Sequence, residues 1–167
     1  PEIVRGIQQR GLDAPILLRF QDLLAARIRK LNECFEEAIA RNGYQGQYRG
    51  VFPIKVNQQK HVIEEITRFG KQYHFGLEAG SKPELLAALA YMHDPEAYLI
   101  CNGYKDSEFI DLALCGLKMG LQTVLVIEMP GEVDLILERA ERMGVRPILG
   151  MRVKLAARND GRWSRSS

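Results

Sequence analysis

The chain has 167 residues, the usual length of one domain and enough to bury a hydrophobic core. Hydrophobic residues make up 46% and charged residues 26%, which excludes a disordered, collagen-like or disulfide-dense chain. Lys and Arg number 23 and Asp and Glu 21, so the net charge of +2 does not indicate a nucleic-acid groove or a polybasic membrane surface. We therefore expect a folded domain without nucleic acid or membrane partners.

The sequence contains no targeting or membrane-spanning pattern. No segment is apolar over the roughly 18 residues that a transmembrane helix needs, and the N-terminal residues PEIVRGIQQRG lack the apolar core of a signal peptide. Cys34, Cys101 and Cys115 form no CxxC pair, so we expect reduced thiols and a cytoplasmic location. Because the chain begins at Pro1 and stops in a loop-like stretch, we also expect a fragment.

Helices and strands are predicted to alternate along most of the chain. A first helix is expected over 22–41, where apolar residues recur at helical spacing before Asn42-Gly43. Strands are predicted near 48–55, 74–79, 97–102, 123–128 and 147–153, and helices near 58–69, 82–92, 106–119 and 131–143. A spacing of about 25 residues between strands is typical of parallel strands joined by a helix. The predicted fold class is therefore α/β.

Four βα units and a fifth strand build either an open doubly wound sheet or part of a (β/α)₈ barrel. The first strand-to-helix turn, Lys55-Val56-Asn57-Gln58, lacks the G-x-G-x-x-G of dinucleotide-binding sheets. A complete barrel takes about 250 residues, so we predict the first half of a barrel. We expect an N-terminal lead and helix over 1–46, a partial barrel over 47–155 and a truncated loop over 156–167.

Polar residues recur at the carboxyl ends of the predicted strands. Side chains alternate between the faces of a strand, so Phe52, Ile54 and Val56 are expected to share the helix-facing side of the first strand. The inward faces then end in Lys55, Glu78, Asn102, Glu128 and Arg152. We predict that these residues form a ring at the edge where barrel enzymes carry their chemistry. The alternative is that they are solvated strand ends, as is usual for charged residues.

Lys55 differs from the other four because it interrupts the apolar run VFPIKV, which is typical of a buried strand. Burial disfavours the charged form of a lysine, and an uncharged amine is what Schiff-base chemistry requires. Lys55 is therefore the candidate catalytic residue.

The segment YRGVFPIKVNQ (48–58) resembles the cofactor-lysine motif of the biosynthetic arginine decarboxylases, which are pyridoxal-phosphate enzymes with an alanine-racemase-like barrel. Further segments resemble that family in order and spacing: HFGLEAGSKPEL (74–85), ICNGYKD (100–106), VIE (126–128) and LGMRVKL (149–155). The resemblance covers nearly the whole chain.

The resemblance implies that Lys55 carries pyridoxal 5′-phosphate, that Glu78 lies beside this lysine and that Arg152 lies near the ring oxygen of the cofactor. Asn102, at a strand end, is a further cofactor-binding candidate. Ser81 is another, although Ser81 and Glu84 also fit a capping box, which would explain their spacing without a ligand. The resemblance also admits Mg²⁺ and implies that the full-length protein is a homo-oligomer.

The resemblance implies a carboxy-lyase that converts L-arginine to agmatine and CO₂, an arginine-degrading step in putrescine and spermidine biosynthesis. The chain alone is expected to be inactive, because the family places its ring-stacking His and phosphate-binding glycine loop later in the sequence. Two alternatives stay open. One is another pyridoxal-phosphate barrel enzyme, such as a diaminopimelate or ornithine decarboxylase or a racemase. The other is a non-catalytic truncated relative that binds a partner through an open sheet edge.

Overall fold

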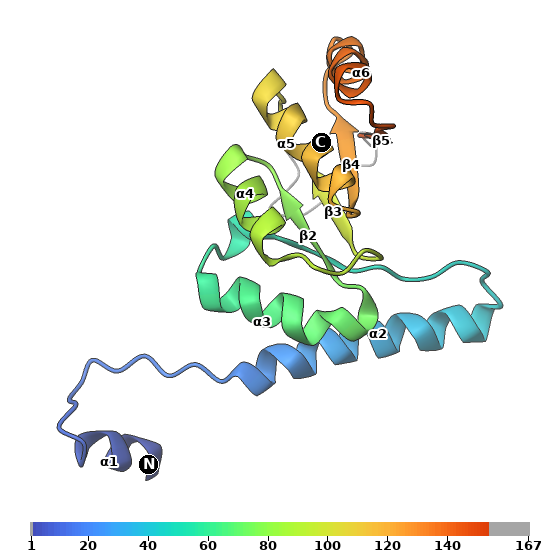
Figure 1. The fold of residues 1–167 in the computed structure, drawn as a ribbon. Coiled ribbons are helices and arrows are strands. Elements are labelled where there is room, and N and C mark those ends of the chain that lie inside the picture. The colour runs from blue at the N-terminus through green and yellow to red at the C-terminus, as the bar shows by residue number, and fades with distance from the viewer. Residues whose placement is uncertain (1, 154–167) are drawn as a thin grey trace, which may run out of the picture.

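In a computed structural model, which describes residues 2–153, five parallel strands form one sheet (Figure 1). The strands are β1 (Val51–Pro53), β2 (Gly76–Ala79), β3 (Tyr98–Cys101), β4 (Gln122–Ile127) and β5 (Ile148–Met151). They lie side by side in chain order, and every neighbouring pair is parallel. An open doubly wound sheet reverses its strand order at a switch point, whereas a barrel adds strands in sequence. The strand order therefore favours the predicted barrel segment.

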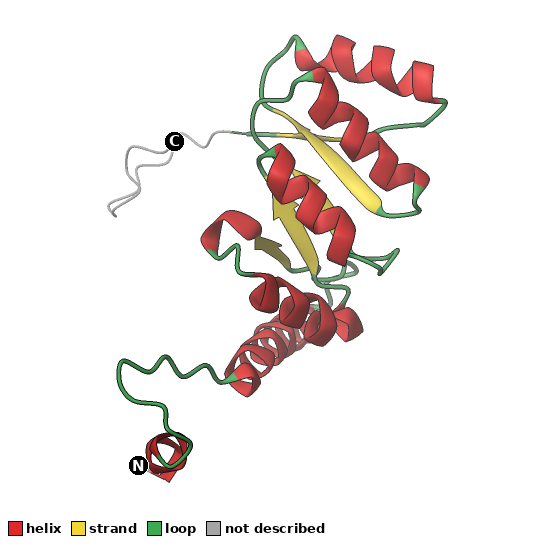
Figure 2. Ribbon diagram, turned by 60° about the vertical axis from the view of Figure 1, so that its left-hand side comes forward, coloured by secondary structure: helices red, strands yellow, loops and turns green. Residues whose placement is uncertain are grey.

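Helices connect the strands and lie along one face of the sheet (Figure 2). They are α3 (Lys60–Gly70), α4 (Lys82–Tyr91), α5 (Ser107–Lys118) and α6 (Glu132–Met143). Two short 3₁₀ turns, η1 (Ile54–Val56) and η2 (Lys71–Tyr73), follow β1 and α3. Each of these four helices begins and ends within two residues of its predicted position. The predicted alternation of strand and helix is confirmed.

Two helices precede the sheet. α2 (Gln21–Asn42) packs against α3 and buries Ile28, and it ends at Gly43, whose φ of 60° provides the left-handed C-terminal stop that the Asn-Gly pair predicts. α1 (Glu2–Gln8) was not predicted from the sequence. It buries no residue and extends away from the sheet (Figure 1).

The face of the sheet beneath the helices forms the hydrophobic core. Alternate residues of the three central strands are completely buried there: Leu77, Ala79, Leu99, Cys101, Thr123 and Leu125. The helices contribute equally buried side chains, among them Leu85, Ile110 and Leu114. Burying such side chains contributes about 1.5–3 kcal/mol each relative to their exposure. The core therefore lies on the helix side, as the alternation of apolar residues predicts.

The opposite face of the sheet carries the residues predicted to point inward. Glu78, Ile100, Val124 and Ile148 are paired across neighbouring strands in one row. These four side chains are only partly buried, because none of the described helices lies on this side. The predicted alternation of faces is confirmed for β2 to β5.

β1 is shorter than predicted. The chain leaves the strand after Pro53 and turns through η1, where the amide of Asn57 donates to the carbonyl oxygen of Ile54 at 3.1 Å. Alternation with a period of two stops at this turn. Val56 was expected on the buried face with Phe52 and Ile54, and this prediction is wrong because the turn leaves Val56 68% exposed. The loop predicted over 156–167 lies outside the described residues.

Candidate active site

Lys55 lies in η1, immediately beyond the carboxyl end of β1. Its side chain is 66% exposed, so the expectation of a lysine buried in an apolar strand is wrong. The turn explains the difference, because it directs Ile54 into the core and leaves Lys55 in solvent. The candidacy of Lys55 therefore depends on its position at the strand end and not on burial.

Glu78 lies beside Lys55. The Nζ atom of Lys55 is 3.8 Å from Oε1 of Glu78, whose side chain is only 13% exposed. The pairing of Pro53 with Glu78 across β1 and β2 brings the two together. The two opposite charges attract each other at this distance. The structure therefore brings these two predicted site residues together.

The connection from β2 to α4 contains Ser81 and Glu84. Ser81 is the residue before the first turn of α4, but its side chain makes no capping hydrogen bond. The carboxylate of Glu84 reaches past it and accepts a hydrogen bond from the amide of Gly80 at 2.8 Å. The capping-box interpretation is therefore wrong, because in a capping box the serine hydroxyl binds the helix. The Ser81 hydroxyl is not occupied by the helix terminus.

Asn102 follows β3 and lies against the end of β2. Its amide donates to the carbonyl oxygen of Ala79 at 2.9 Å. The next residue, Gly103, has a φ of 77°, and a Cβ atom there would lie 3.0 Å from the carbonyl oxygen of Gly80. Only glycine fits this left-handed, closely packed position. The loops after β2 and β3 therefore touch, and they bring Asn102 next to Gly80.

Glu128 joins the ends of β3, β4 and β5. Its Oε1 atom accepts a hydrogen bond from the amide of Gly103 at 3.1 Å and another from Arg152 Nη1, also at 3.1 Å. Glu128 is 11% exposed, whereas Arg152 is 54% exposed. Four members of the predicted ring thus form two ion pairs, Lys55 with Glu78 and Arg152 with Glu128. The fifth member, Asn102, precedes Gly103, whose amide binds Glu128. The Gly80–Gly103 approach links the two pairs.

Two charged residues that the sequence pattern did not single out lie at the same edge. The Lys105 ammonium is completely buried and donates to the carbonyl oxygens of Gly103, at 2.6 Å, and of Val126. It also lies 3.4 Å from Glu132 Oε2, which accepts a hydrogen bond from the amide of Glu128 at 2.8 Å. Opposite charges shortly after two successive strand ends were the signal that could have identified this pair.

The buried acidic groups at this edge have pKa values shifted in opposite directions. Burial alone would raise the pKa of Glu132, but hydrogen bonds from the amides of Glu128 and Lys105 and the Lys105 charge outweigh it and lower that pKa. Burial raises the pKa of the nearby Cys101 thiol to about 12. Cys101 is therefore not a nucleophile at neutral pH, since the thiolate is the reactive form.

The described residues offer no metal site. Within 2–153, no group of three or more His, Cys, Asp or Glu side chains is arranged to hold a metal ion. The Mg²⁺ that the resemblance admits is therefore not matched by a cluster of this kind among these residues. In the same part of the chain, no helix combines the length and apolarity needed to cross a membrane.

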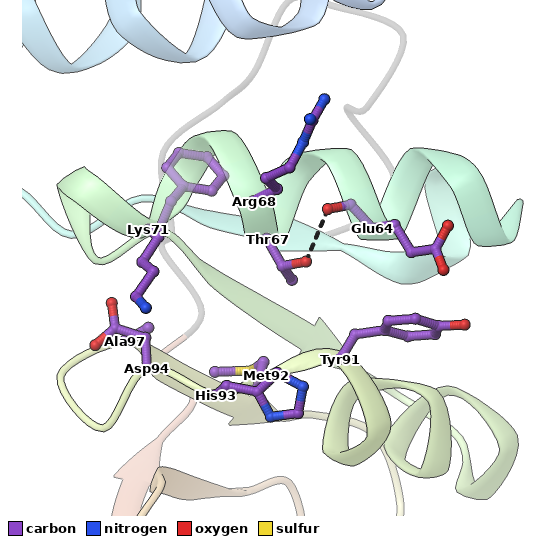
Figure 3. A pocket seen from close by; sticks show the side chains of 10 residues that line it. Glu64, Thr67, Arg68, Lys71, Tyr91, Met92, His93, Asp94 and Ala97 are labelled. Atoms are coloured by element: carbon purple, nitrogen blue, oxygen red, sulfur yellow. Dashed lines mark hydrogen bonds between the residues drawn. The ribbon is translucent and has the colours of Figure 1, made fainter.

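A cavity of about 290 Å³ lies at the other end of the sheet, away from the carboxyl ends of the strands (Figure 3). Arg68 in the last turn of α3 and Lys71 in η2 line it, together with Tyr91 at the end of α4 and Asp94 in the connection that follows. Both helices run back from the carboxyl ends of the strands, so the ends of these helices, and the cavity with them, lie near the amino ends of the strands. Barrel and doubly wound enzymes bind ligands at the carboxyl ends. The cavity is therefore separate from the candidate active site.

A parallel α/β barrel segment with a lysine at the carboxyl edge defines a class that includes cofactor-binding barrels. Residues 25–166 match the family described as pyridoxal-dependent decarboxylase, pyridoxal binding domain, and the chain belongs to that family. It is 52% identical to the biosynthetic arginine decarboxylase of Thermosynechococcus vestitus and 53% identical to that of Gloeobacter violaceus, in both cases over 99% of the chain. The chain spans about a quarter of these relatives' length, 26% in each case.

Solved structures of two decarboxylases are among those that resemble the fold. The biosynthetic arginine decarboxylase SpeA from Campylobacter jejuni matches 93% of this chain and 26% of its own chain, with a TM-score of 0.85 and 35% sequence identity. The diaminopimelate decarboxylase from M. jannaschi matches 77% of this chain and 28% of its own, with a TM-score of 0.60 and 19% identity. The second likeness concerns the fold alone. The prediction that the chain forms the first half of a pyridoxal-phosphate-binding barrel is confirmed.

Proposed function

We propose that this chain forms the first half of the cofactor-binding barrel of an enzyme that decarboxylates L-arginine to agmatine. The observation that carries this proposal is the exposed amine of Lys55 beside Glu78, at the carboxyl edge of the sheet and within the VFPIKVNQQ segment. Relatives about 50% identical over nearly the whole chain are named biosynthetic arginine decarboxylase, which favours arginine over other substrates. None of the described residues by itself selects a guanidinium group.

The described residues fit pyridoxal 5′-phosphate by the chemistry of their donor groups. Lys55 offers an exposed primary amine, and the Ser81 hydroxyl is not engaged by its helix. Gly80 and Gly103 cross the strand ends without side chains, which allows close approach of a ligand to the backbone. The residues proposed to hold the cofactor are Lys55, Glu78, Ser81, Asn102 and Arg152. Lys55 would bind it covalently through Nζ.

The chain's own residues have separable tasks at this edge. When bound, pyridoxal phosphate supplies the electron sink for the electron pair that remains after CO₂ departs. Lys55 binds through Nζ and is the group that can hold or return a proton at that atom. Glu78 orients this amine, and Arg152, held by Glu128, places a positive charge that attracts anionic groups. These tasks account for the four charged residues of the ring.

We further propose a cytoplasmic, homo-oligomeric enzyme that acts in putrescine and spermidine formation. The proposed organisation is an N-terminal lead and helix over 1–46, a partial barrel over 47–155 and a loop over 156–167. The observed start of β1 at Val51 and end of β5 at Met151 support the first of these boundaries and the extent of the barrel part.

The test measures decarboxylation by the full-length protein, by which we mean this chain extended to the length of its relatives. Carboxyl-labelled L-arginine should release CO₂ and leave agmatine, and Lys55→Ala should abolish both. Lys60→Ala is the matched control, because Lys60 is a similarly exposed lysine that pairs with Glu64 on α3. Preferential turnover of ornithine or diaminopimelate would favour another branch of the family. A full-length protein that neither binds the cofactor nor turns over an amino acid would support the non-catalytic alternative.

A further inference from the structure

Lys105 and Glu132 form a buried ion pair that the proposed mechanism does not use. Their side chains are 0% and 7% exposed, and Nζ of Lys105 lies 3.4 Å from Oε2 of Glu132. Two ionised groups lose several kcal/mol of hydration when they are buried, and an apolar pair of similar volume is often equally stable. The pair therefore needs an explanation other than stability alone.

The two residues connect loops that both reach the carboxyl edge. Lys105 precedes α5 in the loop after β3, and Glu132 is the first residue of α6, after β4. The amide of Lys105 donates to Glu132 Oε1 at 3.0 Å, so backbone and side chain of Lys105 both bind this carboxylate. The remaining hydrogen bonds of the Lys105 ammonium go to the carbonyl oxygens of Gly103 and Val126. The pair thus fixes the spacing between the two loops.

A closed circuit of contacts runs from this pair to the candidate site. Glu132 binds the amide of Glu128, and the carboxylate of Glu128 in turn binds the amide of Gly103. Lys105 holds the carbonyl oxygen of the same glycine, which completes the circuit. Within this circuit, the Glu128 carboxylate also accepts hydrogen bonds from Arg152, one of the cofactor-binding candidates.

We propose that Lys105 and Glu132 are positioning residues, which hold the Glu128 carboxylate in place against Arg152 at the cofactor-binding edge. This inference rests on the proposed function, because it assigns the edge to pyridoxal phosphate. Glu132 is suited to the task because it stays ionised at neutral pH, as its lowered pKa requires. Rigid support of this kind is what a site needs when its own side chains are partly exposed.

The first measurement needs no bound cofactor. Glu132→Gln preserves the side-chain volume but leaves one neutral acceptor oxygen in place of the carboxylate, which weakens the hydrogen bonds from the amides of Glu128 and Met129. In the cofactor-free full-length protein, hydrogen exchange of these two amides is expected to become at least about tenfold faster. Lys105→Met is expected to have the same effect on them. Lys105→Arg keeps the charge and serves as the second variant if Lys105→Met does not fold.

The matched control is Arg139→Met. Arg139 on α6 pairs with Asp111 on α5, so it joins the same two helices by a half-buried ion pair that does not touch the circuit. Its loss should lower stability while leaving exchange at Glu128 and Met129 within about twofold of the parent. A similar acceleration in this control would mean that the effect is general loosening, and the inference would be wrong.

The second measurement asks whether the pair acts through Glu128. The dissociation constant of pyridoxal phosphate should rise about tenfold in Glu132→Gln and about tenfold in Glu128→Gln, and no further in the double variant. A hundredfold rise in the double variant, or unchanged binding in a folded Glu132→Gln protein, would overturn the inference alone. A parent protein that binds no cofactor would overturn the proposed function first and this inference with it.

Discussion

Lys55 and Glu78 meet at 3.8 Å from environments that differ sharply, since the lysine side chain is 66% exposed and the carboxylate 13%. The carboxylate is held in the sheet by β2, whereas the lysine extends from a turn. A ligand can therefore reach Nζ from the solvent side without displacing Glu78. This asymmetry suits an amine that must be approached by a cofactor while it keeps a fixed electrostatic partner.

Reductive labelling should identify Lys55. Borohydride treatment of the full-length protein in the presence of pyridoxal phosphate is expected to leave the pyridoxyl group on Lys55. Lys82 is the informative competitor. Hydrogen bonds from its ammonium to Asp106 and Glu108, at 2.7 and 2.6 Å, raise its pKa and keep it protonated, so it is a poorer nucleophile. Peptide mapping that found the label on Lys82 or Lys60 would disprove the assignment.

Glu78→Gln and Arg152→Met should change the cofactor's environment more than the fold. Removing a charge next to Lys55 or at the same edge is expected to move the pH midpoint of the cofactor absorbance by about one pH unit and to lower kcat. Unfolding free energy should change by less than about 1 kcal/mol, because both ion pairs include an exposed partner. Spectrophotometric pH titration and urea unfolding measure the two quantities. An unshifted titration with full turnover would identify both residues as solvated strand ends.

The sequence pattern predicts the sheet and helices well because burial imposes regular periods on them. The strands keep alternate residues such as Leu77 and Leu99 fully buried, and α2 stops at a glycine with positive φ. η1 was missed, since VFPIKV has the composition of a strand and the turn depends on how Ile54 packs in three dimensions. α1 was missed because it has only 7 residues and buries none of them, and so short a segment gives too few positions for a helical period to be recognised.

The sequence predicted which residues lie at the candidate site, but not which of them contact one another. Strand-end residues such as Glu78 and Glu128 follow from alternation, and the structure gathers them at one edge. Contacts between loops do not follow from it. Lys105 lies in NGYKD, which has the composition of an exposed loop, and its burial depends on a carboxylate 27 residues later in the chain. Pairing over such a separation is set by packing, so one sequence without structure does not reveal it.

Thr123→Val should stabilise the protein. Thr123 is completely buried under α5, and among the described residues its hydroxyl has no hydrogen-bond partner. Valine has the same shape without the polar atom, so the change removes a desolvation penalty of about 1–3 kcal/mol. The urea midpoint should rise accordingly. Gly116→Ala is the opposing control, because its Cβ atom would lie 2.5 Å from the Thr123 hydroxyl oxygen and should destabilise by about 1–3 kcal/mol. A lower midpoint for Thr123→Val would contradict the prediction.

The contribution of Glu132 to stability should depend on pH. Its pKa in the folded protein is lowered from the ordinary value of about 4.3, so the ionised carboxylate favours the folded state. The contribution is complete above about pH 4.3 and is lost as the pH falls through the lowered pKa. The destabilisation by Glu132→Gln should therefore be largest near neutral pH, at about 3 kcal/mol, and should shrink in acid. Urea unfolding at neutral pH and in acid measures this destabilisation. Glu141→Gln, at an exposed position of α6, is the control.

Thiol reactivity should divide the three cysteines by burial. Cys34 and Cys115 are exposed, whereas Cys101 is completely buried in β3 and burial raises its pKa to about 12. Because the thiolate is the reactive form, Cys101 at pH 8 is both inaccessible and almost entirely protonated. Iodoacetamide should therefore modify Cys34 and Cys115 in the folded protein and reach Cys101 only after denaturation. Mass spectrometry of the peptides that contain each cysteine measures the three rates of modification. The positive charge of Lys105 lowers the pKa of Cys101, but burial raises it by more. Lys105→Met removes that charge, so Cys101 should stay unreactive as long as the helices cover β3. Fast labelling of Cys101 in the unmodified protein would mean that the helix-covered face of the sheet opens readily, and it would contradict the packing described for this face.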